Sequence, residues 1–206
     1  MQAVALDVLC HSGGMTSAPP DPRPLKQRRA TRLVVLSGSA VDRSVLLFED
    51  SDPGLPEYRW WVTPGGGIDP GEDTVTAGLR ELQEETGWQA RVEDLTGPLS
   101  TRLAVHGYSD QILVQHETFF AIQTPRFELD TSGHTEDEKL TLKSWRWWPL
   151  SELAESDDGP WVWPGYLLEL VELAGDVPGL PLDFGIEIDE STWPLSPAEL
   201  RAVHQL

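Results

Sequence analysis

Three carboxylates cluster near the middle of the chain, where Glu81, Glu84 and Glu85 follow the basic residue Arg80. At 100° per residue, a helix over residues 74–86 places the three glutamates within an arc of about 100°. Like charges at these spacings destabilise a helix by a few tenths of a kcal/mol per pair. Mg²⁺ binds carboxylates together with substrate phosphates, so the cluster is suited to holding that cation. Taken alone, a Glu-rich helical face is more often solvated surface.

The segment ahead of this helix is a glycine-rich turn, Pro64-Gly65-Gly66-Gly67. Consecutive glycines permit positive φ and allow a ligand or another backbone to approach closely. A backbone carbonyl of the turn could complete a metal shell, and its amides could face a phosphate. Turn and helix together therefore form one candidate site.

The joint spacing of the turn and the helix is more specific than either part. Gly66 is followed after five residues by Glu72, and after seven more by residues 80–88, which read RELQEETGW. This pattern resembles the Nudix box, G-x5-E-x7-R-E-U-x-E-E-x-G-U, in which U is a bulky apolar residue. A chance match in a chain of this length is on the order of one in a million. Trp88 stands where the family usually has an aliphatic residue.

The resemblance implies a role for each matched charged residue on the helix. Glu84 and Glu85 would be direct metal ligands. Glu81 would be a further ligand or the base that activates water. Arg80 would orient Glu81 through a charge-assisted pair and would not contact the substrate.

The resemblance also assigns roles in the turn and implies a cofactor. Glu72 would hold the loop beside Gly66 against the helix, or bind metal through water. The carbonyl of Gly65 would be a main-chain ligand. The implied cofactor is Mg²⁺ or Mn²⁺, which neutralises an anionic diphosphate and positions the attacking water.

Two further groups are weaker candidates. Many family members add an acid from a later loop, and Glu138 within residues 135–138 is our choice, with Glu117 as the alternative. A basic cluster made of Arg28, Arg29 and Arg32 could meet substrate phosphates, and a merely solubilising role fits it equally well.

The elements that must position these residues follow from short apolar runs and turn signals. Strands are predicted near 33–36, 45–48, 59–62, 90–96, 99–105, 111–123 and 142–148, and helices at 74–86, from 151, and at 166–174. This order suggests an α/β protein with a mixed sheet and helices on both faces. The resemblance implies a Nudix-type α/β/α sandwich.

Three regions are expected along the chain. Residues 1–27 read as a flexible tail, and residues 28–175 as the Nudix hydrolase domain, because a Trp-x-x-Pro-Gly-Gly lead-in and a later segment at 147–153 extend the resemblance. Residues 176–206 read as an acidic extension. The capping-box spacing of Ser196 and Glu199 predicts a short helix within that extension.

The composition excludes several classes of function. Fifteen Lys and Arg against 34 Asp and Glu give a net charge of −19. This is a poor match for binding nucleic acid through a basic patch or for lying on an anionic membrane. The single cysteine, Cys10, excludes an internal disulfide and a multi-cysteine zinc site. With no apolar run near the ~18 residues of a spanning helix and no signal peptide, we expect a cytoplasmic protein.

The resemblance implies a Mg²⁺-dependent pyrophosphohydrolase that cleaves a diphosphate bond in a nucleoside diphosphate-linked substrate. A sugar nucleotide such as ADP-ribose, a nucleoside triphosphate and a dinucleoside polyphosphate all remain open, and so does a homodimer. One alternative is a catalytically silent Nudix-fold nucleotide sensor, although the glutamates of the box are intact. Another is isopentenyl diphosphate isomerase, whose chemistry uses a cysteine and for which Cys10 is a poor candidate.

Overall fold

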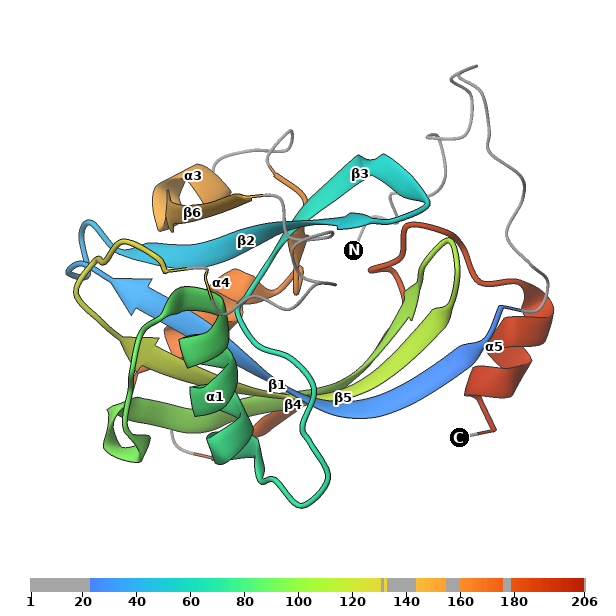
Figure 1. Cartoon of the computed structure of the whole chain (residues 1–206), viewed down its shortest axis with the longest axis horizontal. Helices are drawn as coiled ribbons and strands as arrows, with labels where there is room; N and C mark the ends of the chain where they lie inside the picture. Colours follow the sequence, from blue (N-terminus) through green and yellow to red (C-terminus); the bar gives the residue numbers. More distant parts are fainter. Residues whose placement is uncertain (1–22, 131, 133–143, 155–159, 176–178, 206) are drawn as a thin grey trace.

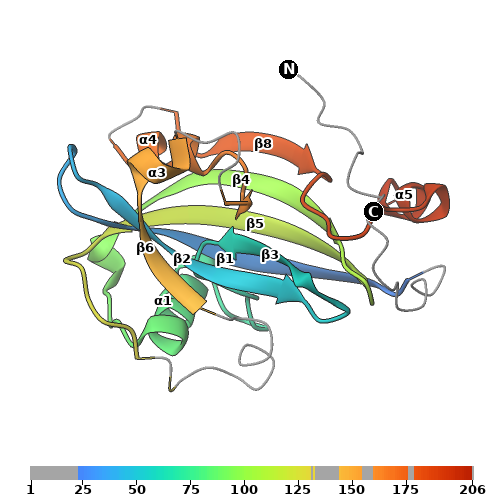
Figure 2. The ribbon, with the colours of Figure 1, turned by 90° about the horizontal axis from the view of Figure 1, so that it is seen from above.

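The computed structural model describes residues 23–130, 132, 144–154, 160–175 and 179–205. Figures 1 and 2 show a strongly curled sheet with α1 on one side, α4 on the other and α5 at one end. In chain order the elements are β1 (Leu25–Ser37), β2 (Ser44–Asp52), β3 (Leu55–Val62), α1 (Thr74–Thr86), η1 (Val92–Asp94), β4 (Leu95–Gly107), β5 (Ile112–Gln123), β6 (Ser144–Pro149), α3 (Leu150–Ala154), β7 (Val162–Trp163), α4 (Leu167–Leu173), β8 (Leu182–Glu187) and α5 (Pro197–Val203).

The sheet is mixed. Its strand order is β7-β3-β2-β1-β5-β4-β8, and β6 pairs with β2 beside this path. The pairs β1–β5, β3–β7 and β4–β8 are parallel, and the remaining pairs are antiparallel. Because β1 pairs with β5 over its whole length but with β2 only at its end, most of the opposite edge of β1 is available to another segment.

Side chains alternate across β1, so neighbouring residues enter two different cores. Leu33 packs with Leu46 and Leu82 on the face covered by α1. Val34 packs with Leu170 on the face covered by α4. The expected α/β/α sandwich with a mixed sheet is therefore confirmed.

Most predicted elements are present, and the helix at 74–86 has the predicted bounds. The two strands expected at 90–96 and 99–105 are wrong in detail, because η1 is followed by one continuous strand, β4. A register shift between Thr96 and Ser100 absorbs the Gly97-Pro98 step without ending the pairing with β5. The sequence did not predict β8.

The C-terminal segment, defined here as residues 179–205, is joined to the same sheet and core. β8 extends the edge of the sheet by pairing with β4, and Val203 of α5 packs against Val105 and Val114. The predicted capping box is present, since Ser196 accepts from the Glu199 amide and Glu199 accepts from the Ser196 amide.

The other end of the described chain meets this segment. β1 begins within the stretch expected to be a tail, and residues 1–22 lie outside the described residues. The buried Arg23 forms an ion pair with Glu199 at 2.8 Å and also donates to backbone carbonyls of Tyr108 and Pro194. Residue 23 is thus anchored to α5.

Candidate active site

Helix α1 carries most of the candidate residues, and local signals explain its bounds. The side chain of Asp73 accepts hydrogen bonds from the amides of Val75 and Thr76 and so caps the first turn. Gly87 ends the helix in the left-handed region, with φ of 74°, a conformation that glycine adopts without strain. Leu82 anchors the helix to the sheet.

The glycine-rich loop lies along the edge of β1 that β2 leaves open. The amides of Thr31 and Leu33 donate to the carbonyls of Gly66 and Pro64, at 3.0 and 2.8 Å. Gly65 has φ of +127°, and a Cβ there would lie 2.3 Å from the Thr31 carbonyl oxygen. Glycine is required at this position because any side chain would collide with β1.

The same loop contacts the carboxylates of α1. A Cβ on Gly66 would lie 2.7 Å from the carboxylate of Glu81, so only glycine allows this close approach. The Gly65 amide donates to Oε2 of Glu85 at 2.8 Å. Loop and helix therefore meet at Glu81 and Glu85, which are 6% and 5% exposed.

Arg80 lies at the centre of the acidic side chains. Its Nη1 donates to Glu81 at 2.8 Å and to Glu84 at 2.9 Å, while Nε and Nη2 donate to the two oxygens of Glu72. Nη2 also donates to the Gly67 carbonyl at 2.9 Å. Hydrogen bonding to Glu72 above all raises the pKa of Arg80, so the guanidinium stays charged. We call this group the acidic cluster; it consists of Glu72, Arg80, Glu81, Glu84 and Glu85.

The three helical glutamates differ in exposure, which the helical arc alone did not indicate. The side chain of Glu84 is 42% exposed, whereas Glu81 and Glu85 are buried against the loop. Within the described part of the chain, no three His, Cys, Asp or Glu side chains are arranged to hold a metal ion. In this arrangement Arg80 and the Gly65 amide occupy carboxylate oxygens of the cluster.

The donor chemistry of the acidic cluster fits a divalent cation. Three of its four carboxylates pair with the Arg80 guanidinium, and the fourth, Glu85, accepts from the Gly65 amide. All its side-chain acceptors are oxygens, which Mg²⁺ and Mn²⁺ prefer. The nearby carbonyl of Gly65 accepts from Arg32 at 2.9 Å. A carbonyl oxygen has two lone pairs, so a second partner can be accommodated there.

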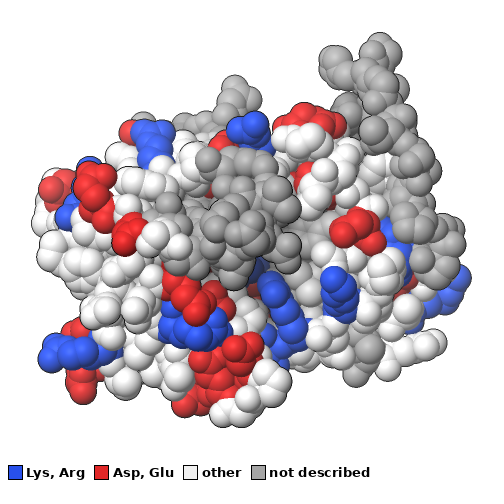
Figure 3. All heavy atoms as spheres, in the orientation of Figure 1, with Lys and Arg blue, Asp and Glu red and all other residues white. Residues whose placement is uncertain are grey.

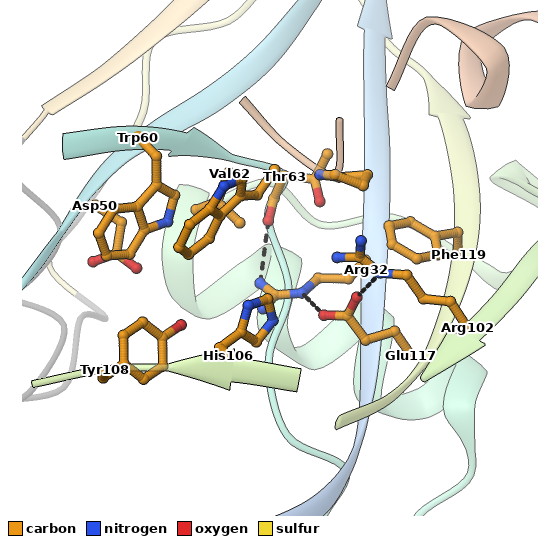
Figure 4. A pocket seen from close by; sticks show the side chains of 12 residues that line it. Arg32, Asp50, Trp60, Val62, Thr63, Arg102, His106, Tyr108, Glu117 and Phe119 are labelled. Carbon is orange, nitrogen blue, oxygen red and sulfur yellow. Dashed lines mark hydrogen bonds and ion pairs between the residues drawn. The ribbon is translucent and has the colours of Figure 1, made fainter. Parts of the chain in front are cut away.

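Arg32 belongs to a second group of charged side chains, which extends across the neighbouring strands β1, β5 and β4 (Figure 4). Glu117 lies between two arginines, accepting from Arg32 at 3.0 Å and from Arg102 at 2.6 Å. Arg102 also donates to Glu190 at 2.9 Å. We call this group the interior ion-pair chain; it consists of Arg32, Glu117, Arg102 and Glu190.

Burial and charge act in opposite directions on the acids of this chain. Burial raises the pKa of Glu117, but Arg102 and then Arg32 outweigh it and hold the pKa at about 2. For Glu190, burial outweighs the hydrogen bond from Arg102 and raises the pKa. Glu117 is therefore ionised near neutral pH, and the charges of the two arginines stabilise its carboxylate in the interior.

The remaining candidates fall in different places. Arg28 is exposed beside the loop, where its Nε donates to the buried Gln115 at 2.7 Å and a Cβ on Gly67 would lie 3.5 Å from its Nη1. Arg29 is exposed on the opposite face of β1, and its carbonyl accepts from Ile68. Glu138 lies outside the described residues.

The family assignment follows from comparison with known proteins. The NUDIX domain model matches residues 26–167. The chain belongs to the Nudix family. This Nudix hydrolase is 31% identical over 158 residues to the RNA pyrophosphohydrolase of Brucella ovis, a match covering 68% of this chain and 84% of the relative.

Two further similarities agree with this assignment. The RNA pyrophosphohydrolase of Rhodopseudomonas palustris is 35% identical over 103 residues, 45% of this chain and 57% of the relative. Among solved structures, the MutT protein of Bacillus halodurans is 19% identical, with a TM-score of 0.51 over 78% of this Nudix chain and 90% of that one. The structural likeness supports the fold.

A stack of aromatic side chains lies next to the interior ion-pair chain in the interior of this Nudix protein. Trp163 stacks on Trp60 and on His106, with ring centroids 4.3 and 5.3 Å apart, and His106 stacks in turn on Tyr108. These side chains, together with Arg32, Arg102 and Glu117 of the interior ion-pair chain, line a cavity of about 20 Å³, which has room for about one water. Burial lowers the pKa of His106 to about 4, so its ring is neutral near pH 7.

Sequence reasoning missed Arg102 and Glu190. Glu117 carried a signal, because it is the one acidic residue of β5, and it faces the interior with Phe119. Arg102 and Glu190 lie 88 residues apart and share no local pattern.

In the part of the chain that the structure describes, no helix is long and apolar enough to cross a membrane.

Proposed function

We propose that this Nudix hydrolase is a metal-dependent pyrophosphohydrolase that cleaves a diphosphate bond in a nucleoside diphosphate-linked substrate. The carrying observation is the meeting of loop and helix. There Glu85 accepts the Gly65 amide, Glu81 lies against Gly66, and Arg80 pairs with Glu81 and Glu84. These contacts bring together the four charged helical positions of the Nudix box.

Glu81, Glu84, Glu85 and the Gly65 carbonyl are the groups that would hold Mg²⁺ or Mn²⁺. The bound cation supplies charge neutralisation for the diphosphate and a lowered pKa for the attacking water. Arg80 orients the Glu81 carboxylate, which is the group we propose to accept a proton from water. Glu72 fixes Arg80 from the loop side through two hydrogen bonds.

Arg28 is the residue we propose to contact a substrate phosphate. Its Nε donates to Gln115, which orients the guanidinium, and its Nη1 lies beside Gly67 of the loop. A guanidinium fixed in this way can bind phosphate oxygens in a bidentate manner. Arg32 has a different role here, because it is bound to Glu117 and to the Gly65 carbonyl.

The substrate is best identified by a panel. It comprises ADP-ribose, nucleoside triphosphates, dinucleoside polyphosphates and, because the curated relatives are named RNA pyrophosphohydrolase, RNA with a 5′-triphosphate end. Each compound is incubated with Mg²⁺ and with EDTA, and products are resolved by chromatography. We expect Mg²⁺-dependent cleavage of one class to a nucleoside monophosphate or, for RNA, to a 5′-monophosphate end.

Glu85→Gln is the matched control for this panel. An amide oxygen can still accept the Gly65 amide, so the variant keeps the loop contact while losing the charge. We expect an inactive, folded variant. Turnover that persists in EDTA, or in Glu85→Gln at the wild-type rate, would overturn the proposal; a compound that raises the Tm without being cleaved favours the nucleotide sensor.

A further inference from the structure

Glu190 lies in the C-terminal segment, beyond the residues that the NUDIX domain model matches, yet its side chain reaches the protein interior. It is 6% exposed. Arg102 contacts it with both terminal nitrogens, at 2.9 and 2.8 Å. The amide of Gly165 donates to it at 2.9 Å, and its own carbonyl contacts His106 Nδ1 at 2.8 Å. The residue is therefore held rigidly on several sides.

From Glu190 a continuous series of contacts leads to the glycine-rich loop. Arg102 donates to Oε2 of Glu117 at 2.6 Å, and Arg32 donates to Oε1 of the same carboxylate at 3.0 Å. Arg32 then donates through Nη1 to the carbonyl of Gly65 at 2.9 Å. Figure 4 shows Glu117 between the two guanidinium groups.

Gly65 is held through both of its backbone polar groups. Its carbonyl accepts from Arg32, and its amide donates to Oε2 of Glu85 on α1. A displacement of Arg32 would therefore change the position of the Gly65 backbone and, through it, the Glu85 carboxylate. The series of contacts thus ends at two groups of the proposed metal site.

Positive and negative charges alternate along the series, so the loss of the charge at Glu190 changes the contacts of the residues that follow. Glu117 shares its two oxygens between two arginines, and Arg102 is also neutralised by Glu190. Without the charge of Glu190, Arg102 would have Glu117 as its remaining carboxylate and would attract it more strongly. Because these groups are buried, that attraction is weakly screened, and the bond from Glu117 to Arg32 would lengthen.

We propose that Glu190 is a positioning residue of the Nudix active site. It acts through Arg102, Glu117 and Arg32 on the backbone of Gly65. The C-terminal segment then completes the site from outside the matched domain. The link to catalysis rests on the proposed function, whereas the positioning of the loop does not.

Glu199 provides a matched control. It lies in the same segment, is 4% exposed and pairs with the buried Arg23, but its contacts lead to the N-terminal end of β1 and not to the loop. Glu190→Gln and Glu199→Gln each remove one buried charge from an Arg–Glu pair. Both variants should lose global stability, so a difference between them at the active site reports positioning.

The first measurement is hydrogen–deuterium exchange of the wild type and both variants without metal, read on the peptide containing residues 63–68. In Glu190→Gln we expect exchange of this peptide to be at least about fivefold faster, and in Glu199→Gln unchanged. The second is the rise in Tm on addition of Mg²⁺ or Mn²⁺ alone, which should be smaller in Glu190→Gln. With a cleaved substrate in hand, kcat should fall about tenfold in Glu190→Gln, with little change in KM.

Equal exchange of the 63–68 peptide in both variants would overturn the proposal. If Glu190→Gln does not fold, Glu190→Asp and Glu199→Asp give the same comparison with the charge retained on a shorter side chain. Failure of the proposed function has a different signature, because the wild type would then cleave no compound of the panel while the exchange difference persisted.

Discussion

Two groups of arginines and glutamates in this enzyme differ in charge balance and in exposure. The acidic cluster, on α1 and the loop before it, has four carboxylates and one arginine, a net charge of −3, and Glu84 is partly exposed. The interior ion-pair chain has two of each and is largely buried. The excess negative charge suits the first group to a cation, whereas the charges of the second group balance one another. Charge imbalance, more than the number of charges, distinguishes the proposed metal site from the interior ion-pair chain.

The largest effect is expected from neutralising the exposed acid of the cluster. Glu84→Gln should reduce turnover on the order of 10⁴-fold, about 5 kcal/mol in the barrier, because a cation ligand is lost. The unfolding free energy should change by less than about 1 kcal/mol, since the side chain is 42% exposed. Steady-state kinetics and urea unfolding measure the two quantities. Glu93→Gln, whose side chain is 75% exposed, is the control. A Glu84→Gln enzyme that keeps a tenth of the wild-type turnover would contradict the distinction between the acidic cluster and the interior ion-pair chain.

The same substitution in the interior chain should act on stability. Glu117→Gln leaves Arg32 and Arg102 buried with too little negative charge, and we expect a loss of about 3–5 kcal/mol in the unfolding free energy. Urea unfolding at pH 7 measures it, with Glu152→Gln, whose pair with Arg146 is exposed, as control. A loss no larger than that of the control would show that the interior chain does not stabilise the fold.

Acid should weaken the interior through His106. Its pKa is about 4 in the folded protein, below the ordinary 6.5, so the stabilisation is fully present above pH 6.5 and is lost as the pH falls towards 4. The expected loss over this window is about 3 kcal/mol. Urea unfolding between pH 7 and pH 4 checks it. In His106→Asn, whose amide can still donate to the Glu190 carbonyl, this part of the pH dependence should disappear; an unchanged slope would contradict the assignment.

The smallest effect is expected for an ion pair at the surface. Arg91 pairs with Asp94 at 3.1 Å, and the Arg91 side chain is 76% exposed. Arg91→Ala should lower the urea midpoint of unfolding only slightly, because water screens the pair. A midpoint lowered as far as that of Glu117→Gln in the same urea assay would mean that burial is not what separates the interior chain from other ion pairs.

What the sequence predicted was set by neighbours in the chain. The helix at 74–86 and the capping box at Ser196 and Glu199 follow from residues at most a few positions apart, and the structure confirms both helices. The position of Gly66 against Glu81 could not be obtained from spacing, because it depends on where the loop meets β1.

Long-range partners escaped prediction for a related reason. Arg102 finds Glu190 across 88 residues, and β8 is recognisable as a strand only once it pairs with the edge of β4. Gly185 and the acids around it make residues 182–187 a weak strand by propensity. Tertiary pairing decided both features.

The partners that close this fold are also separated in time. Arg23 pairs with Glu199, which lies 176 residues later in the chain. At a synthesis rate of about 5–20 residues per second, Glu199 is therefore added to the chain roughly 9–35 s after Arg23. Until then, burying Arg23, or burying Arg32 and Arg102 with Glu117 as their one carboxylate, would leave an arginine charge uncompensated, which costs several kcal/mol. We therefore expect the interior to close only after the C-terminal segment has been synthesised. A nascent chain that stalls before residue 190 would carry a complete Nudix box and an interior still open to water.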